Sequence, residues 1–252
     1  MSVKPKKTLA QHFLTDKNIA RKIVGYIRTD GIEHVIEVGP GMGILTQFIS
    51  LPRGIDFTAI ELDADSVAYL KSEFPGLAQN IIHADFLNYD FPGKPTSVIG
   101  NFPYNISSQI FFKILENRHL VLEATGMIQK EVAQRIAAKP GSKTYGILSV
   151  LLQAYYNIEY LFSINPTVFK PPPKVMSAVI RLTRNHTVKL DCDEALFFKL
   201  VKTAFNQRRK VLHNSLKSFV TQNAGHPLLN KRPEQLNINE FVSLTQHFQV
   251  NQ

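Results

Sequence analysis

Cysteine and long apolar runs are scarce in this chain of 252 residues. Cys192 is the only cysteine, which excludes an intrachain disulfide and a cysteine-based zinc site and suits a reducing compartment. The longest apolar stretch begins at Tyr145, contains polar residues, and is far shorter than the roughly 18–20 residues that span a bilayer. The N-terminal segment is basic but has no apolar signal-peptide core, and it has no arginine before Arg21, which disfavours a mitochondrial presequence. We therefore expect a cytoplasmic protein without a membrane segment.

Acidic residues are also fewer than basic ones, so the formal net charge is +9. Residues 184–252 hold ten Lys and Arg against five Asp and Glu, and this last quarter carries more than half of the excess. Such an imbalance indicates a polyanionic partner, nucleic acid before membrane, although a merely solubilising surface explains the charge equally well.

Strand-like apolar runs alternate with segments of helical spacing through most of the chain. The strands are expected at 34–39, 56–62, 80–86, 96–100 and 124–129, and the helices at 43–50, 64–74, 107–117 and 131–138. A helical stretch at 146–156 and two further strands at 157–164 and 177–182 follow, with a proline-rich loop that can close an antiparallel edge pair. This alternation predicts an α/β fold with a parallel sheet covered on both faces.

Beyond residue 185 the pattern becomes purely helical, so we expect a domain boundary near 184–190. The predicted organisation is a flexible basic arm at 1–8, an α/β domain at 9–184, and a helical domain at 185–252.

The expected first strand runs into a glycine-rich turn that contains Gly39, Gly41 and Gly43. The spacing is neither the dinucleotide fingerprint nor a P-loop, and taken alone it fits a tight strand-to-helix corner equally well. Acidic residues, however, follow at the ends of the next two strands. Glu61 is placed to accept hydrogen bonds from ribose hydroxyls, and Asp85 to accept one from an adenine amine. The set indicates a site for an adenosine-type cofactor that lacks a pyrophosphate clamp.

This combination resembles the class I methyltransferases that use S-adenosylmethionine, and the segment "GNFPY" resembles the motif of enzymes that methylate the 6-amino group of adenine. That amine is a poor nucleophile, because its lone pair is delocalised into the ring. The side-chain oxygen of Asn101 and the carbonyl of Phe102 can accept its N–H bonds and favour a pyramidal nitrogen. Pro103 would keep the loop rigid, and Tyr104 would stack on the base. The alternative is a turn with a buried tyrosine.

Three more segments resemble the ribosomal RNA adenine dimethyltransferase A family, whose members dimethylate two adjacent adenines near the 3′ end of small-subunit ribosomal RNA. They are "QHFL" at 11–14, "NPTVFKPPPKVMSAVIRL" at 165–182 and "AFNQRRKVLHNSLK" at 204–217. The resemblance spans nearly the whole chain. His12 stands where the family usually has Asn, and Phe102 where it usually has Leu.

The resemblance implies three groups of functional residues. The cofactor S-adenosylmethionine would contact His12, Leu14, Gly39, Gly41, Glu61, Leu62, Asp85, Phe86 and Asn101. The catalytic group would be Asn101, Tyr104 and Phe169, with Phe169 as a second aromatic clamp; a core phenylalanine is the alternative. Arg208, Arg209 and Lys210, on an expected helix at 206–217, would contact RNA, unless they form an ordinary solvated face. The eight histidines show no metal-binding spacing, and no metal is expected.

The implied partners are small-subunit ribosomal RNA and the pre-ribosomal small subunit, contacted by a monomer. Two rivals remain open. One is a related methyltransferase that modifies an adenine of large-subunit RNA, and the other is a nucleic-acid-binding factor whose methylation activity is dispensable.

Overall fold

The computed structural model describes residues 5–6, 9, 11–219 and 225–250. The chain divides by its internal contacts into two compact units. Unit 1 comprises Met1–Ala133 and Ile158–Arg184, and unit 2 comprises Gln134–Asn157 and Asn185–Gln252. The expected single boundary near 184–190 differs from this division, because residues 134–157 group with the C-terminal residues. Most of the expected arm at 1–8 lies outside the described residues.

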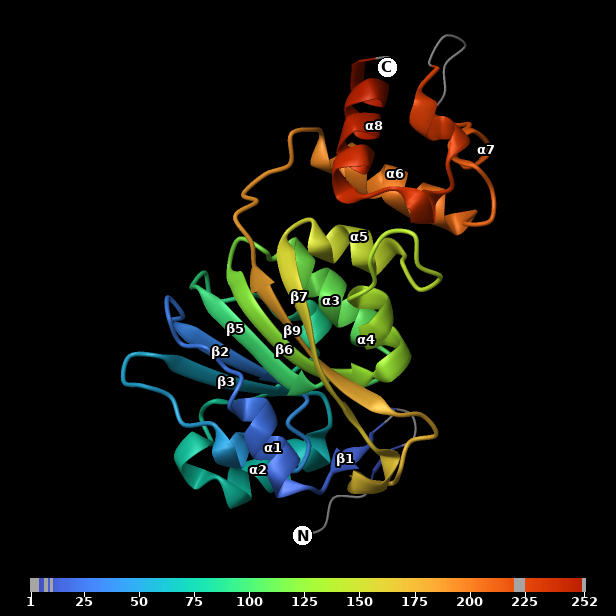
Figure 1. Cartoon of the computed structure of the whole chain (residues 1–252). Coiled ribbons are helices and arrows are strands. Elements are labelled where there is room, and N and C mark those ends of the chain that lie inside the picture. The colour runs from blue at the N-terminus through green and yellow to red at the C-terminus, as the bar shows by residue number, and fades with distance from the viewer. Residues whose placement is uncertain (1–4, 7–8, 10, 220–224, 251–252) are drawn as a thin grey trace. The chain divides into compact units, whose positions relative to one another are not determined.

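Within the described residues, seven strands form one mixed sheet in the order β4-β3-β2-β5-β6-β9-β7 (Figure 1). The strands are β2 (His34–Val38), β3 (Asp56–Glu61), β4 (Ile81–His83), β5 (Thr96–Asn101), β6 (Val121–Gln129), β7 (Tyr156–Ile164) and β9 (Ser177–Arg184). Neighbours from β4 to β6 are parallel, whereas β9 is antiparallel to β6. The predicted α/β class with an antiparallel strand beyond the parallel ones is confirmed.

Helices cover both faces of this sheet in unit 1. They are α1 (Lys17–Val24), α2 (Ala64–Glu73) and α3 (Ser107–Glu116). Ala20 and Ile23 of α1 and Leu70 of α2 are fully buried in the apolar cluster on one face, which also contains Met127. The opposite face holds the buried ring of Phe102, which packs edge-on against Phe111 of α3, with ring centroids 5.7 Å apart.

The strand β2 is an interior strand of the sheet, and all five of its residues are buried, as expected for a parallel strand covered on both faces. It pairs with β3 on one side and with β5 on the other, so the strand order reverses here. In open α/β sheets, ligands bind at the carboxyl ends of the strands beside such a reversal. A separate two-stranded sheet pairs β1 (Phe13–Leu14) with β8 (Phe169–Lys170).

Unit 2 is helical. Its helices are α5 (Ile147–Gln153), α6 (Glu194–Asn206), α7 (Leu212–Ser215) and α8 (Ile238–Val250), while α4 (Lys130–Ile136) begins in unit 1 and ends in unit 2. The helix α6 is capped at its N-terminus by Asp193, whose carboxylate accepts a hydrogen bond from the Leu196 N–H at 3.0 Å. Its buried face packs on α8, where the rings of Phe205 and Phe241 lie 6.0 Å apart.

Two predicted helices are wrong. The segment 43–50 is a turn followed by a 3₁₀ helix at Thr46–Phe48, since Gly43 has a φ of 77°, which an α-helix does not accommodate. The expected helix at 206–217 is interrupted, because Gln207 ends α6 and Val211 is extended, with φ −65° and ψ 153°, directly before α7. Among the described residues, no helix is both long and apolar enough to cross a bilayer.

Candidate active site at the carboxyl ends of the parallel strands

A cavity in unit 1 lies at the carboxyl ends of β2, β3, β4 and β5. One further wall comes from Leu9 and from residues 11–14 near the N-terminus. The cavity is lined by ten of the expected site residues: His12, Leu14, Gly39, Gly41, Glu61, Leu62, Asp85, Phe86, Asn101 and Tyr104. These residues are distributed over about 90 positions of sequence, and the parallel sheet brings them to one edge.

The glycine turn is shaped by its contact with the N-terminal wall. Gly41 has a φ of 59°, and a Cβ atom there would lie 2.9 Å from the ring of Phe13. The backbone N–H of Gly41 donates to Oε2 of Glu61 at 3.0 Å. A side chain at this position would therefore strain the backbone and push the wall away from the cavity.

Glu61 ends β3 as a buried carboxylate that faces this turn. Its second oxygen, Oε1, accepts the N–H of Asp63 at 2.9 Å. Burial raises the pKa of Glu61, although the backbone hydrogen bonds oppose that shift. Each oxygen keeps a second lone pair, so the group is fixed in place and still able to accept two hydroxyl donors.

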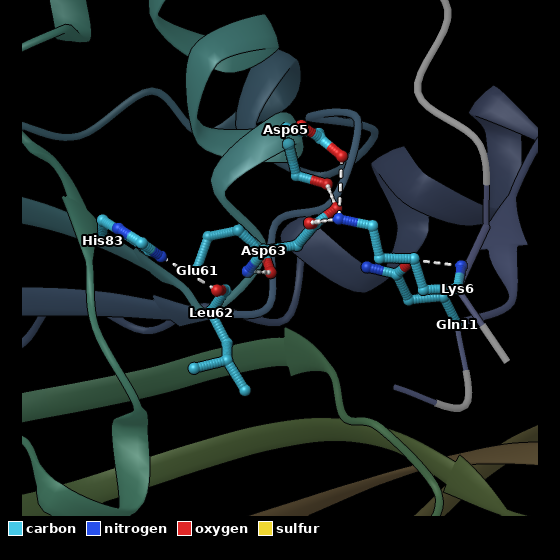
Figure 2. Close-up of polar contacts among 8 residues, drawn as sticks. Lys6, Gln11, Glu61, Leu62, Asp63, Asp65 and His83 are labelled. Carbon is cyan, nitrogen blue, oxygen red and sulfur yellow. Dashed lines mark hydrogen bonds and ion pairs between the residues drawn. The ribbon is translucent and has the colours of Figure 1, made fainter. Parts of the chain in front are cut away.

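The N-terminal segment is fastened beside Glu61 by a lysine (Figure 2). Lys6 Nζ forms an ion pair with the buried Asp63 and a second one, at 2.7 Å, with Asp65. The backbone N–H of Lys6 donates to the side chain of Gln11, which lines the cavity. Burial alone would raise the pKa of Asp63, but the hydrogen bonds from Lys6 and Ser66 hold it below its ordinary value. The ion pair of Lys6 with Asp63 and the hydrogen bond from the Asp63 N–H to Glu61 thus connect the N-terminal wall with the Glu61 carboxylate.

Asp85 and Phe86 line the cavity directly after β4. Both carboxylate oxygens of Asp85 already accept hydrogen bonds, from the Leu87 N–H at 2.9 Å and from Nδ2 of Asn88 at 3.0 Å. Asp85 therefore caps the short helix at Phe86–Asn88 and keeps its remaining lone pairs for a ligand. Phe86 is buried, whereas the side chain of Leu62 is 49% exposed and offers an apolar surface at the cavity.

Asn101 is oriented by one hydrogen bond. Its Nδ2 donates to the backbone carbonyl of His12 at 2.9 Å, and this hydrogen bond fixes the direction in which the amide oxygen Oδ1 points. Among the described residues, neither this oxygen nor the carbonyl of Phe102 accepts a hydrogen bond. Both atoms therefore lack a donor within the part of the chain that the structure describes; Asn101 is half-buried at the cavity, whereas Phe102 lines it as a fully buried residue.

Tyr104 is held at both ends of its side chain. The hydroxyl lies 2.5 Å from Oγ of Ser177, and the ring stacks on the imidazole of His12, with centroids 5.5 Å apart and an interplanar angle of 29°. Burial raises the pKa of Tyr104, so the phenol is neutral over the physiological range.

Phe169 is not brought to the cavity. It pairs in β8 with Leu14 of β1, is only 4% exposed, and belongs to the apolar cluster beneath that strand. In this conformation it supports the N-terminal wall from behind, and it presents no ring opposite Tyr104.

Sequence reasoning missed one carboxylate in the cavity. Glu37 lies in β2 and is fully buried, and Oγ1 of Thr46 donates to its Oε2 at 2.7 Å. Burial raises the pKa of Glu37 to about 7. The available signal was a carboxylate between apolar residues of the strand, two positions before Gly39.

The cavity is acidic. Glu37, Glu61 and Asp85 line it, and its described lining contains no Lys or Arg. A phosphate-bearing cofactor would meet carboxylates here, whereas a cation would be attracted. In the described part of the chain, no group of three His, Cys, Asp or Glu side chains could hold a metal ion.

The expected RNA-contacting residues lie in unit 2 and divide into two kinds. Arg208 is engaged within the unit, since its Nη2 donates to the Ser142 carbonyl at 3.1 Å and its Nε lies 3.9 Å from Glu234. Arg209 and Lys210, in contrast, line an open hollow. That hollow is also lined by Lys217, a basic residue of the same expected helix at 206–217, and by Arg232, which the sequence did not single out for this role.

Comparison with known proteins gives consistent matches over the whole chain. The family model "Ribosomal RNA adenine dimethylase" matches residues 2–251. A protein named ribosomal RNA small subunit methyltransferase A from Phocaeicola vulgatus is 56% identical over 250 residues, covering 96% of this chain and 89% of its own length. The protein of the same name from Cytophaga hutchinsonii is 52% identical, covering 96% of each chain.

Solved structures are similar as well. A dimethyladenosine transferase from Plasmodium falciparum superposes with a TM-score of 0.76 at 23% identity, over 95% of this chain and 98% of its own. The 23S rRNA methyltransferase ErmE gives a TM-score of 0.69 at 26% identity, over 92% and 99% of the two chains.

Proposed function

The chain belongs to the ribosomal RNA adenine dimethylase family, and we propose that it transfers methyl groups from S-adenosylmethionine to the 6-amino groups of two adjacent adenines near the 3′ end of small-subunit ribosomal RNA. Relatives named for the small subunit are 52–56% identical to this chain, whereas the 23S enzyme ErmE is 26% identical. This difference favours small-subunit RNA over large-subunit RNA. The observation that carries the activity is the pair of unoccupied acceptors, Asn101 Oδ1 and the Phe102 carbonyl, beside an acidic cavity.

The residues of the cavity fit S-adenosylmethionine, which supplies an activated methyl group on a positively charged sulfur. Glu61 would accept hydrogen bonds from both ribose hydroxyls, because its two oxygens are fixed by backbone N–H groups and each keeps a lone pair. Asp85 and the apolar side chains of Leu62 and Phe86 would hold the adenine of the cofactor. The carboxylates favour a cation, and the absence of Lys and Arg from the described lining argues against a phosphate-bearing ligand.

The target amine is activated by positioning. Asn101 Oδ1 and the Phe102 carbonyl accept its two N–H bonds, which draws the nitrogen towards a pyramidal geometry and concentrates its lone pair. The Asn101 amide needs no reorganisation, since its Nδ2 is already bound to the His12 carbonyl. Preorganised acceptors of this kind stabilise the charge that develops on the nitrogen in the transition state.

Tyr104 holds the target base by stacking. Its ring lines the cavity beside Asn101, and its hydroxyl is anchored on Ser177. Phe169 contributes by packing behind the wall at 12–14, in place of the clamp expected from the sequence.

The basic hollow of unit 2 would bind phosphates of the RNA. Arg209, Lys210, Lys217 and Arg232 supply the charge, and Arg208 braces the unit through Ser142 and Glu234. We also propose that the protein acts as a monomer in the cytoplasm, on a precursor of the small subunit.

Mass spectrometry of small-subunit RNA tests this function. RNA from cells that lack the protein should contain two unmethylated adenines that become dimethylated when the wild-type protein is returned. Return of the Asn101→Ala variant at equal abundance should leave them unmethylated. Methylation that is complete without the protein would contradict the proposed function and favour the rival of a factor with dispensable methylation. Full restoration by the variant would exclude amine activation by Asn101.

A further inference from the structure

His12 contacts the two proposed catalytic side chains at once. Its imidazole stacks on the ring of Tyr104, and its backbone carbonyl accepts the hydrogen bond that orients Asn101. Resemblance to the family places residue 12 at the cofactor, and His12 lines the cavity, yet its side chain contacts the ring of Tyr104 and the loop after β8.

The imidazole is itself anchored. Nδ1 lies 2.8 Å from the carbonyl oxygen of Pro171, and since a carbonyl can only accept, Nδ1 carries the hydrogen and donates. The neighbouring residues fix the backbone as well, because Phe13 pairs with Lys170 and the Thr15 N–H donates to the Val168 carbonyl at 2.8 Å. The ring of His12 thus rests on a stable support when it contacts Tyr104.

Tyr104 needs this second contact. The hydrogen bond between its hydroxyl and Ser177 fixes the tip of the side chain but leaves the ring plane free to rotate about the axis through that tip. A stacked neighbour restricts the rotation, because the stacking energy depends on the angle between the planes.

The spacing of the two rings also defines where a base can lie. Each stacked pair separates its centroids by at least about 4.5 Å, so a base between the two rings would require roughly 9 Å. The observed separation is 5.5 Å. The target adenine therefore stacks on the face of Tyr104 that His12 does not cover.

We propose that His12 is a positioning residue, which covers one face of Tyr104 and sets the plane on which the target adenine stacks. This inference rests on the proposed function, and it assigns the side chain of residue 12 to the substrate base and not to the cofactor.

Single-turnover methylation of small subunits from cells that lack the protein tests the inference, at saturating cofactor and subunits. Loss of the ring in His12→Ala should lower the rate by about 3- to 10-fold. His12→Phe keeps a ring and should retain most of the rate, whereas His12→Asn keeps an N–H donor without a ring and should behave like His12→Ala. Affinity for cofactor by calorimetry, and for subunits by filter binding, should change by less than about twofold. His119→Ala removes an exposed histidine of the same unit and serves as the control.

A double-mutant cycle separates positioning from a general loss of structure. In a Tyr104→Ala background the His12→Ala change should have no further effect on the rate, since its target is gone. An effect that persists in this background, a full rate for His12→Asn, or a weakened affinity for cofactor would overturn the inference. If His12→Ala does not fold, the comparison of the Phe and Asn variants decides alone. A wild-type protein that transfers no methyl group would instead refute the proposed function.

Discussion

Replacement of Glu37 by glutamine should stabilise the protein at neutral and alkaline pH. Glu37 is fully buried in β2, and burial raises its pKa from 4.5 to about 7. The folded state thus binds this proton more tightly than the unfolded state does. As the pH rises from about 4.5 through 7, folding must increasingly bury the charged form, and stability falls. At about 1.4 kcal/mol per pKa unit, the loss approaches about 3 kcal/mol at pH 8.

Glutamine imitates the protonated side chain. Its Oε1 can accept the hydrogen bond that Thr46 Oγ1 now donates at 2.7 Å, and it carries no charge at any pH. Urea unfolding of the cofactor-free protein at pH 5 and pH 8 measures the effect. Going from pH 5 to pH 8, wild type should lose about 2.5 kcal/mol relative to Glu37→Gln, because part of the loss has already occurred at pH 5. Glu73→Gln, on the exposed side of α2, is the matched control and should follow wild type.

Parallel stability profiles for wild type and Glu37→Gln between pH 5 and pH 8 would refute the reasoning. Such a result would mean that Glu37 ionises in the folded protein as readily as in water, so that solvent reaches this part of the cavity.

Three further predictions concern the cofactor, the chemistry and the RNA. Glu61→Ala should weaken S-adenosylmethionine binding by about 1.5–3 kcal/mol per ribose hydrogen bond lost, and unchanged calorimetric affinity would remove Glu61 from the site. Asn101→Ala should lower the single-turnover rate by about 10²-fold with subunit affinity unaltered, and a normal rate would exclude amine activation by this side chain. Replacing Arg209 and Lys210 by Gln should reduce the salt slope of log affinity by about 0.7–0.9 per lost phosphate contact. Arg208→Gln should instead lower the melting temperature and leave the salt slope unchanged. If Arg208→Gln reduces the salt slope and the change at Arg209 and Lys210 lowers the melting temperature, Arg208 contacts RNA and the other two support the fold.

The parallel sheet was predictable because its strands are short apolar runs bounded by turn residues. The sequence of β2 is apolar at three of five positions, Val35, Ile36 and Val38, and burial on both faces favours such a run. The two wrong helices failed for local reasons that spacing does not reveal. One contains Gly43 with a positive φ, and the other contains a break at 207–211 between two helical turns.

The division into units was harder to predict. Residues 134–157 are continuous in sequence with the α/β pattern, yet they pack with the C-terminal helices. The Gly141 N–H donates to the Glu234 carbonyl at 2.6 Å, and Arg208 binds the Ser142 carbonyl. Contacts of this kind join segments about 70–90 residues apart, and a local sequence pattern does not predict them.

The candidate site was predictable where motifs follow strands, as at Gly41, Glu61 and Asn101. Two features required the structure. The stacking of His12 on Tyr104 depends on the pairing of β1 with β8, which brings residue 12 next to residue 171. The burial of Phe169 depends on the same pairing, since the residue that faces Leu14 across two short strands is turned into the core.

The net charge of +9 conceals two opposite local charges, and each suits a different part of the substrates. The cavity of unit 1 is lined by Glu37, Glu61 and Asp85, which attract a cationic methyl donor and repel phosphate. The hollow of unit 2 is lined by basic side chains that attract phosphate. We therefore expect the carboxylates to repel an RNA backbone from the cavity, whereas an uncharged base that is turned out of its stack would reach Asn101 without this electrostatic cost. If RNA binds the hollow as proposed, we expect this separation of charge to select a base of the bound RNA as the methyl acceptor.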